Sequence, residues 1–183
     1  MRKKRLTTQK MAMIGVMAAF YVVLSLYVAA IKLGNVKITF ASVPTILMAT
    51  LFGPLEGMLT AAIGSFICQM ISYGFTATTV LWILPPVFRA CMVGFMAKAI
   101  SRDGKNPEEH KVLFPACIVL AAVITTAVNT FVIWADSVIY GYYTYAYVFG
   151  QTVARFITGI ATAVAVSLII TTIIRPLRKV VSK

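Results

Sequence analysis

Long apolar runs separated by short polar segments dominate the chain. A helix needs about 20 apolar residues to cross the hydrocarbon of a bilayer, and all but one of the runs have about this length. The pattern predicts an all-α membrane protein, a bundle of six transmembrane helices in a single domain that covers 1–183. The expected spans are Lys10–Ile31, Ala41–Phe52, Leu55–Tyr73, Val80–Ile100, Val112–Trp134 and Val148–Ile174.

The second span is too short for a simple crossing. About 12 helical residues rise about 18 Å, which is less than the hydrocarbon thickness of about 30 Å. Irregular or short segments at membrane depth are tolerated where protein or water surrounds them. We therefore expect this helix to be tilted, sheltered or broken.

Composition excludes several classes of protein. The 183 residues are 60% hydrophobic and 12% charged, with a mean hydropathy of +0.90, so a soluble domain is excluded. The net charge of +12 does not indicate nucleic-acid binding, because the basic residues stand in tails and loops around apolar runs. Three cysteines lie inside apolar runs and the only histidine lies in a charged loop, so we expect no metal site and no cofactor.

Catalysis is not expected either. The sequence has no phosphate-binding loop of the Gly-x-x-x-x-Gly-Lys-Ser/Thr type, no His-Glu-x-x-His motif and no Gly-x-Ser-x-Gly motif. No acidic residue stands in the interior of an apolar span, so the usual proton or sodium relay of a self-powered transporter is missing. We therefore expect neither an enzyme nor an ATP-hydrolysing subunit.

Most of the 17 basic residues gather in three segments that six spans place on one side of the membrane. Since positive residues stay on the cytoplasmic side, both termini are expected there. Four basic residues fall instead on the outer side or in the outer half, where Asp136 is the only acid. They are Lys32, Lys37, Arg89 and Arg155.

Arg89 lies inside the apolar stretch Trp82–Gly94, and Arg155 lies near the start of the last span. Each is expected about two turns, or about 10 Å, below the outer surface. Charges at membrane depth are costly and commonly functional, so an anionic ligand is one explanation for the pair. The alternative is that each arginine extends to the interface or donates to loop carbonyls.

Other residues near this level have two interpretations each. Pro85-Pro86 either begins the fourth helix or interrupts a longer one. Asn129 either contacts a polar solute or bonds between helices. Trp82 either anchors the interface or stacks against a ligand ring, and the tyrosines of Asp136–Tyr147, Tyr140 among them, form either an interfacial belt or a lid.

Several motifs taken together resemble the substrate-binding S components of energy-coupling factor (ECF) vitamin transporters. The similarity covers nearly the whole chain and is closest to the folate-type branch, which includes folate and pantothenate carriers. The motifs are the basic N-terminus, the spacing Gly15-Val16-Met17-Ala18-Ala19, the segment Ser42-Val43-Pro44, the turn Leu51-Phe52-Gly53-Pro54-Leu55-Glu56-Gly57, the element Gly74-Phe75-Thr76, and the fourth span with Arg89 and Gly94.

This resemblance implies a bundle that captures a vitamin outside and delivers it by toppling within a complex of a transmembrane coupling subunit and two ATPases. It assigns docking on the coupling subunit to Gly15 and Ala19, although packing inside the bundle explains that spacing equally well. It also implies that the outer loops shape the site. The loop residues concerned are Asn35, Lys37, Thr76 to Thr79 (Thr78 and Thr79 among them) and the tyrosine segment.

The segment Ala77–Trp82 departs from the folate carriers, and we expect ligand choice to depend on it. The function predicted from the sequence is capture of a carboxylate-bearing B vitamin, pantothenate or folate, by an S component in the cell membrane. Arg89, Arg155 or Lys37 would bind the carboxylate through charge-assisted hydrogen bonds. The alternatives are a small membrane scaffold or assembly subunit and a standalone secondary carrier.

Overall fold

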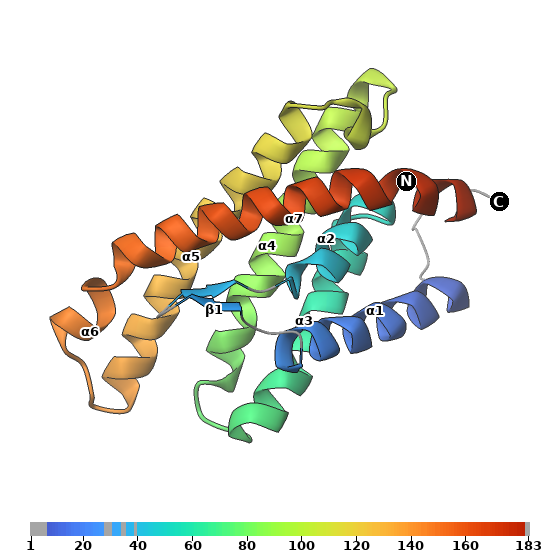
Figure 1. Ribbon diagram of the computed structural model, residues 1–183. Helices are drawn as coiled ribbons and strands as arrows, with labels where there is room; N and C mark the ends of the chain where they lie inside the picture. Colours follow the sequence, from blue (N-terminus) through green and yellow to red (C-terminus); the bar gives the residue numbers. More distant parts are fainter. Residues whose placement is uncertain (1–6, 28–30, 34–35, 39, 182–183) are drawn as a thin grey trace.

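The computed structural model describes residues 7–27, 31–33, 36–38 and 40–181. Helices form nearly all of this part of the chain, and one short hairpin accompanies them (Figure 1). In chain order the elements are α1 (Thr8–Leu26), β1 (Ile31–Leu33), β2 (Val36–Ile38), α2 (Ser42–Leu51), α3 (Pro54–Tyr73), α4 (Thr79–Ile100), η1 (Ser101–Asp103), η2 (Pro107–Glu109), α5 (Leu113–Ile139), α6 (Tyr145–Phe149) and α7 (Thr152–Val181).

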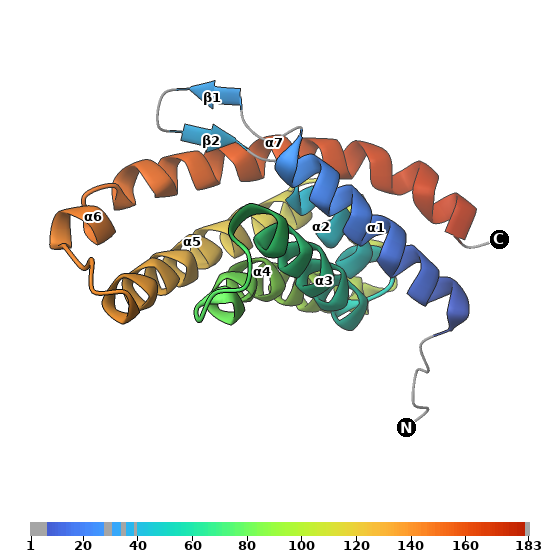
Figure 2. The same cartoon turned by 90° about the horizontal axis from the view of Figure 1, so that it is seen from below.

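Five of the described helices are long and apolar enough to cross a membrane, namely α1, α3, α4, α5 and α7. The predicted all-helical membrane architecture is confirmed at this level. The second predicted span is the ten-residue helix α2, about 15 Å long, so it cannot cross the bilayer alone. Figures 1 and 2 show the beginning of α1 and the end of α7 at the same end of the bundle.

The prediction that α2 is sheltered is confirmed. Eight of its ten residues are buried, and the helix packs against α1, α3, α4 and α7. The hydroxyls of Thr45 and Thr50 donate to the carbonyl oxygens of Ser42 and Ile46, at 2.9 and 2.8 Å, so they need no partner outside the helix. A short helix at membrane depth is therefore surrounded by protein and not by lipid.

Several predicted helix ends were wrong. The first span was expected to reach Ile31, but α1 ends at Leu26, and Ile31 pairs with Ile38 in the antiparallel hairpin of β1 and β2. A short apolar run does not by itself distinguish strand from helix. Figure 2 shows this hairpin beside α7, which β2 contacts.

The last two spans also differ from the prediction. The fifth helix continues past Trp134 to Ile139, and α7 begins at Thr152, not Val148, and continues past Ile174 to Val181. A helix does not have to end where the hydrocarbon does, because its backbone hydrogen bonds can continue into the polar interface. Part of the expected outer loop is the short helix α6, which holds the predicted start of the last span.

The turn between α2 and α3 depends on glycine and on close helix packing. Gly53 has a φ of 126°, a conformation that favours glycine, and Pro54 begins α3. A Cβ atom at Gly94 of α4 would lie 2.5 Å from the Cα atom of Pro54. The absence of a side chain at this position therefore lets α4 pack directly against the start of α3.

Two ion pairs lie at the end of the bundle where α1 begins and α7 ends. Lys10 Nζ lies 2.6 Å from Glu56 Oε1, so the pair joins α1 to the first turn of α3. Arg178 Nε donates to Glu108 Oε1 at 2.5 Å and Arg178 Nη2 donates to Oε2 at 2.9 Å. This bidentate pair joins α7 to the connection between α4 and α5.

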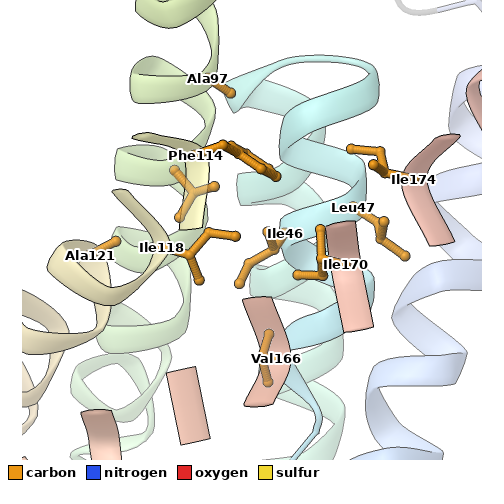
Figure 3. Close-up of a cluster of buried hydrophobic side chains, with 10 residues drawn as sticks. Ile46, Leu47, Ala97, Phe114, Ile118, Ala121, Val166, Ile170 and Ile174 are labelled. Atoms are coloured by element: carbon orange, nitrogen blue, oxygen red, sulfur yellow. The ribbon is translucent and has the colours of Figure 1, made fainter. Parts of the chain in front are cut away.

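The apolar core fills the half of the bundle nearest these ion pairs. Phe114 and Ile118 of α5 are almost fully buried, and Figure 3 shows them directed toward Ile46 of α2. Residues of α4 and α7 complete the cluster, which consists of Ile46, Leu47, Val93, Ala97, Phe114, Ile118, Ala121, Val166, Ile170 and Ile174. The other half of the same helices lines a cavity.

Candidate functional site

On four helices, α2, α4, α5 and α7, the side chains that face the interior of the bundle change from apolar to polar within about one turn of the core. We call the resulting space the central cavity; its volume is about 390 Å³, which is within the usual range of about 300–1,000 Å³ for small-molecule sites. Its lining comes from α1, the start of α2, α4, α5 and α7. The residues are Tyr21, Ala41, Ser42, Thr45, Pro85, Pro86, Arg89, Thr125, Thr126, Asn129, Arg155, Thr158, Gly159 and Thr162.

Arg89 supplies an unbalanced positive charge to this cavity. Its Nε atom is buried and has no hydrogen-bond partner within the described part of the chain. No acidic residue is among the described residues that line the cavity. A guanidinium held at membrane depth without a counter-charge is unfavourable, so the cavity is suited to a ligand that offers an anionic or strongly accepting group.

Arg155 lines the same cavity but already has protein partners. Its Nη1 and Nη2 atoms donate to the carbonyl oxygens of Val148 and Tyr147, at 3.0 and 3.4 Å. The alternative that this arginine bonds to loop carbonyls therefore describes its observed contacts. A guanidinium has five N–H donors, so donors remain for a ligand.

The two arginines lie at different distances from the starts of their helices, and their expected depth of about 10 Å below the outer surface stays a prediction. Arg89 lies about 15 Å along α4 from Thr79, whereas Arg155 lies about 5 Å along α7 from Thr152. The reason is that α4 begins before Trp82 and α7 begins only after α6. Both arginines nevertheless reach the central cavity.

Hydroxyl groups form much of the remaining lining. Thr125 and Thr126 donate to the carbonyl oxygens of Ala121 and Ala122, at 2.6 and 2.9 Å. Thr158 donates in the same way to Arg155 at 3.0 Å. Because their protons are committed to the helix backbone, these hydroxyls offer lone pairs and act as acceptors toward a ligand.

Most of these polar residues were not predicted from the sequence. The missed residues include Tyr21, whose ring packs so closely on α3 that a Cβ atom at Gly64 would lie 2.7 Å from Tyr21 Cδ1. A signal was present in α5 and α7, where polar or small residues recur at helical spacing inside apolar runs. These residues are Thr125, Thr126 and Asn129 on α5, and Arg155, Thr158, Gly159 and Thr162 on α7.

Pro85 and Pro86 lie inside α4, which extends from Thr79 to Ile100. Of the two interpretations of this pair, the helix start is therefore excluded, and the position inside a longer helix remains. Because proline has no N–H group, the carbonyls of Leu81 and Trp82 lose their usual helical donors. Both prolines line the central cavity, so the stretch that carries Arg89 does form one of its walls.

A second space, which we call the aromatic cavity, holds several of the other residues predicted for the site. Its volume is about 460 Å³. Thr78, Trp82 and Tyr140 line it and do not line the central cavity, so the predicted set is divided between two places. The lining residues are Gln69, Tyr73, Thr76, Thr78, Trp82, Asp136, Tyr140, Tyr142 and Tyr147.

Asp136 accepts hydrogen bonds from two of the aromatic side chains that line the aromatic cavity. Trp82 Nε1 donates to its Oδ1 atom at 3.1 Å, and the Tyr142 hydroxyl donates to Oδ2. The bond to this carboxylate raises the pKa of the Tyr142 phenol above its ordinary range, so the hydroxyl remains a donor well above neutral pH. Thr79 is buried beside this region, where its Oγ1 accepts from the Thr76 amide at 2.9 Å.

Gly15 and Ala19, the residues predicted for docking, do not line either cavity. Lys37 pairs with Lys32 in the backbone register of the hairpin, and Asn35 lies outside the described residues. Gly15 and Ala19 are exposed on α1, and a Cβ atom at Gly15 would meet nothing within 4 Å. Packing within the bundle therefore does not account for the small residue at Gly15.

Comparisons with known proteins agree with this architecture. The family model described as "ECF-type riboflavin transporter, S component" matches residues 5–179. No curated protein matches the chain. The solved structure of the S component of a bacterial ECF transporter is similar to it with a TM-score of 0.55 and 16% sequence identity, over 95% of each chain. That likeness concerns the fold, whereas the family model spans nearly the whole sequence, and the chain belongs to the ECF-type riboflavin transporter S component family.

Proposed function

We propose that the central cavity captures a water-soluble B vitamin that bears a carboxylate, pantothenate or folate. The observation that carries the proposal is the Arg89 guanidinium, with an unpartnered Nε atom in a cavity whose described lining contains no acid. A carboxylate would supply the missing charge and accept paired hydrogen bonds from the planar fork.

Membership of the family shows what kind of protein contains this cavity. It confirms that the chain is an S component of an ECF transporter and a multi-pass membrane protein, a transport subunit and not an enzyme. The cavity fits a substrate-binding role in such a transporter because its lining is polar, whereas the adjoining core of the same helices is apolar. Its volume of about 390 Å³ suits a small organic molecule.

The hydroxyl lining supports a ligand that has donors as well as a carboxylate. Thr125, Thr126 and Thr158 act as acceptors, and the Asn129 amide can donate or accept. Pantothenate carries hydroxyls and an amide N–H besides its carboxylate, and folate carries several N–H groups. Either vitamin could therefore bind an arginine through its carboxylate and donate its hydroxyl or N–H groups to the acceptors along α5 and α7.

Riboflavin is the second candidate, and the description of the family favours it. It is uncharged at neutral pH and has ring carbonyls and a hydroxylated chain. Arg89 would then donate to a carbonyl, while the threonines accept from the chain hydroxyls. The two candidates differ in what they require of position 89, because a carboxylate needs the positive charge and a carbonyl needs only a donor.

Uptake requires partners. We propose a transmembrane coupling subunit and two ATPase subunits, because the chain has no phosphate-binding loop motif of its own. The exposed small residues Gly15 and Ala19 are proposed to let a partner helix approach α1 closely. With both termini on the cytoplasmic side, the Lys10–Glu56 and Arg178–Glu108 ion pairs would lie at the cytoplasmic end of the bundle.

The test is ligand identification followed by titration. The full chain is purified in nanodiscs, native mass spectrometry identifies any molecule that accompanies it, and calorimetry measures pantothenate, folate and riboflavin. The proposal expects saturable binding of pantothenate or folate, with riboflavin at least about tenfold weaker. Tight binding of riboflavin alone would replace it with the second candidate.

Two other results of these experiments would favour the alternative classes of protein, a scaffold or a standalone carrier. A monodisperse bundle that binds no vitamin and recruits no ATPase would favour a scaffold. Vitamin uptake driven by sodium or protons without any ATPase would favour a standalone carrier.

A further inference from the structure

The aromatic cavity has no role in the proposed vitamin site. Its lining residues come from α3, the connection between α3 and α4, α4, α5, the segment after α5, and α6. The helices α4 and α5 also line the central cavity, whereas α1, α2 and α7 contribute to the central cavity alone. Five of its described lining residues are aromatic. The ring centroids of Tyr142 and Tyr147 lie 5.4 Å apart, and the planes of the two rings meet at 87°, so these two lining rings are nearly perpendicular.

A buried carboxylate belongs to this aromatic lining. Asp136 is 7% exposed, and its two oxygens accept from the Trp82 indole and the Tyr142 hydroxyl. Both donors are neutral, so they hold the carboxylate in place without cancelling its charge. A carboxylate has about four lone-pair positions, and these two bonds, together with a bond from the Thr78 side chain, leave acceptor capacity.

The negative charge of Asp136 is not balanced by the protein. Neither of the two ion pairs in the described part of the chain includes it, and no Lys, Arg or His is among the described residues that line the cavity. The other four acids lie in or beside the connections at the opposite end of the bundle. Asp136 is therefore an isolated buried charge in a protein that is otherwise strongly basic.

We propose that the aromatic cavity binds a small organic ammonium ion, in particular a methylated ammonium group. Such a cation interacts favourably with the faces of Trp and Tyr rings, and methylated ammonium groups are the ligands for which aromatic cages are best known. The Asp136 carboxylate would add the charge partner. A bare calcium or magnesium ion fits poorly, because those ions require about six oxygen ligands and this cavity offers one carboxylate among rings.

The methylated ammonium group could belong to a free solute or to a choline headgroup of the outer leaflet. The chemistry is shared, and the lipid composition of the test system separates the sources. Free choline binds equally in phosphatidylglycerol and phosphatidylcholine nanodiscs if the natural ligand is a solute. It binds only in phosphatidylglycerol nanodiscs if phosphatidylcholine headgroups already occupy the cavity.

The probe is choline, and the readout is the fluorescence of Trp82. Trp134→Phe leaves Trp82 as the only tryptophan, because the sequence has two. Choline is titrated against its uncharged isostere, 3,3-dimethyl-1-butanol, in phosphatidylglycerol nanodiscs. We expect saturable quenching by choline and at least about tenfold weaker binding of the alcohol. Absence of saturable choline binding, or equal affinity for both probes, would overturn the proposal.

Two variants separate the site from a structural role of Asp136. Asp136→Asn keeps the size of the side chain and removes its charge, and we expect choline affinity to fall at least about tenfold. Tyr140→Ala removes one ring from the lining, and a several-fold loss is expected. Tyr145→Ala is the matched control, since Tyr145 is 72% exposed on α6 and does not line the cavity.

A folding defect would be recognised separately. Choline binding by both Asp136→Asn and Tyr140→Ala at the affinity of the parent chain would contradict the assignment. If Asp136→Asn does not fold, Tyr140→Ala alone decides the outcome. Failure of the vitamin proposal would leave this result unchanged, because none of these residues lines the central cavity.

Discussion

Arg89 and Val93 stand about one turn apart on α4, yet Arg89 lines the central cavity and Val93 is 1% exposed in the apolar core. The same change occurs between Thr45 and Ile46 on α2 and between Thr162 and Val166 on α7. The helices therefore divide the bundle into a packed half and a polar half. This boundary forms the floor of the central cavity and places the arginine beside it.

Close packing of α4 on the start of α3 predicts that Gly94→Ala destabilises the protein. The new Cβ atom would lie 2.5 Å from the backbone of Pro54, which cannot move aside as a side-chain end can. Overpacking of this kind costs about 1–3 kcal/mol. We expect a lower thermal unfolding midpoint in detergent or nanodiscs.

Gly15→Ala is the control for this change. Gly15 is also helical, but a Cβ atom there meets nothing within 4 Å, and alanine is favoured over glycine in a helix. Its midpoint should be unchanged or slightly higher. Equal destabilisation by the two substitutions would argue against the contact between Gly94 and Pro54 being the cause.

The acceptor role of the cavity hydroxyls predicts weaker ligand binding by Thr125→Val. Valine keeps the shape but cannot accept a hydrogen bond, and loss of one such bond costs about 0.5–1.5 kcal/mol. We expect vitamin affinity measured by calorimetry to fall about 2- to 10-fold. Thr172→Val removes a hydroxyl that also bonds to its own helix but is exposed outside the cavity, and it should leave affinity unchanged.

Arg89 and the threonines of the central cavity illustrate what could and could not be predicted from the sequence. A charge inside an apolar run is conspicuous because it is costly there, so Arg89 was recognised as a site candidate. Threonine is common in apolar helices, where it bonds to its own backbone, so the hydroxyls of the lining were not distinguished from ordinary helix residues. Only the arrangement of the helices brings them to one cavity.

The division between two cavities could not be predicted either. Trp82 and Arg89 share one helix, and both were therefore expected in one site. The hydrogen bond from Trp82 to Asp136 joins residues that are distant in the sequence and belongs to tertiary packing. The hairpin was likewise missed, because Ile31 continues the apolar run of α1 in the sequence but pairs with Ile38 in the structure.

The contacts of Arg155 predict that its substitution alters α6, whereas substitution of Arg89 does not. Arg155→Gln loses donors to the carbonyls of Tyr147 and Val148, near the end of α6. We expect faster amide hydrogen exchange in residues 145–150 and a smaller loss of vitamin affinity than for Arg89→Gln. Unchanged exchange in this segment would show that the arginine does not hold it.

The exposed small residues of α1 predict a coupling defect. Gly15→Leu and Ala19→Leu place bulk where a partner helix is proposed to approach, so co-purification with the coupling subunit and ATPases should be lost while vitamin binding remains. Ala116→Leu, at an exposed position of α5, is the control and should retain the complex. A complex that survives both α1 substitutions would place the docking surface elsewhere.

The most direct test of the central claim is calorimetric titration of Arg89→Gln with the vitamin that the parent chain binds. Glutamine keeps a donor but removes the charge, and a hydrogen bond to a charged group is worth about 1.5–3 kcal/mol. We predict that affinity for a carboxylate-bearing vitamin falls about 10- to 150-fold, while Arg102→Gln at the exposed opposite end leaves it unchanged. An Arg89→Gln variant that binds pantothenate or folate with the affinity of the parent chain would contradict the account.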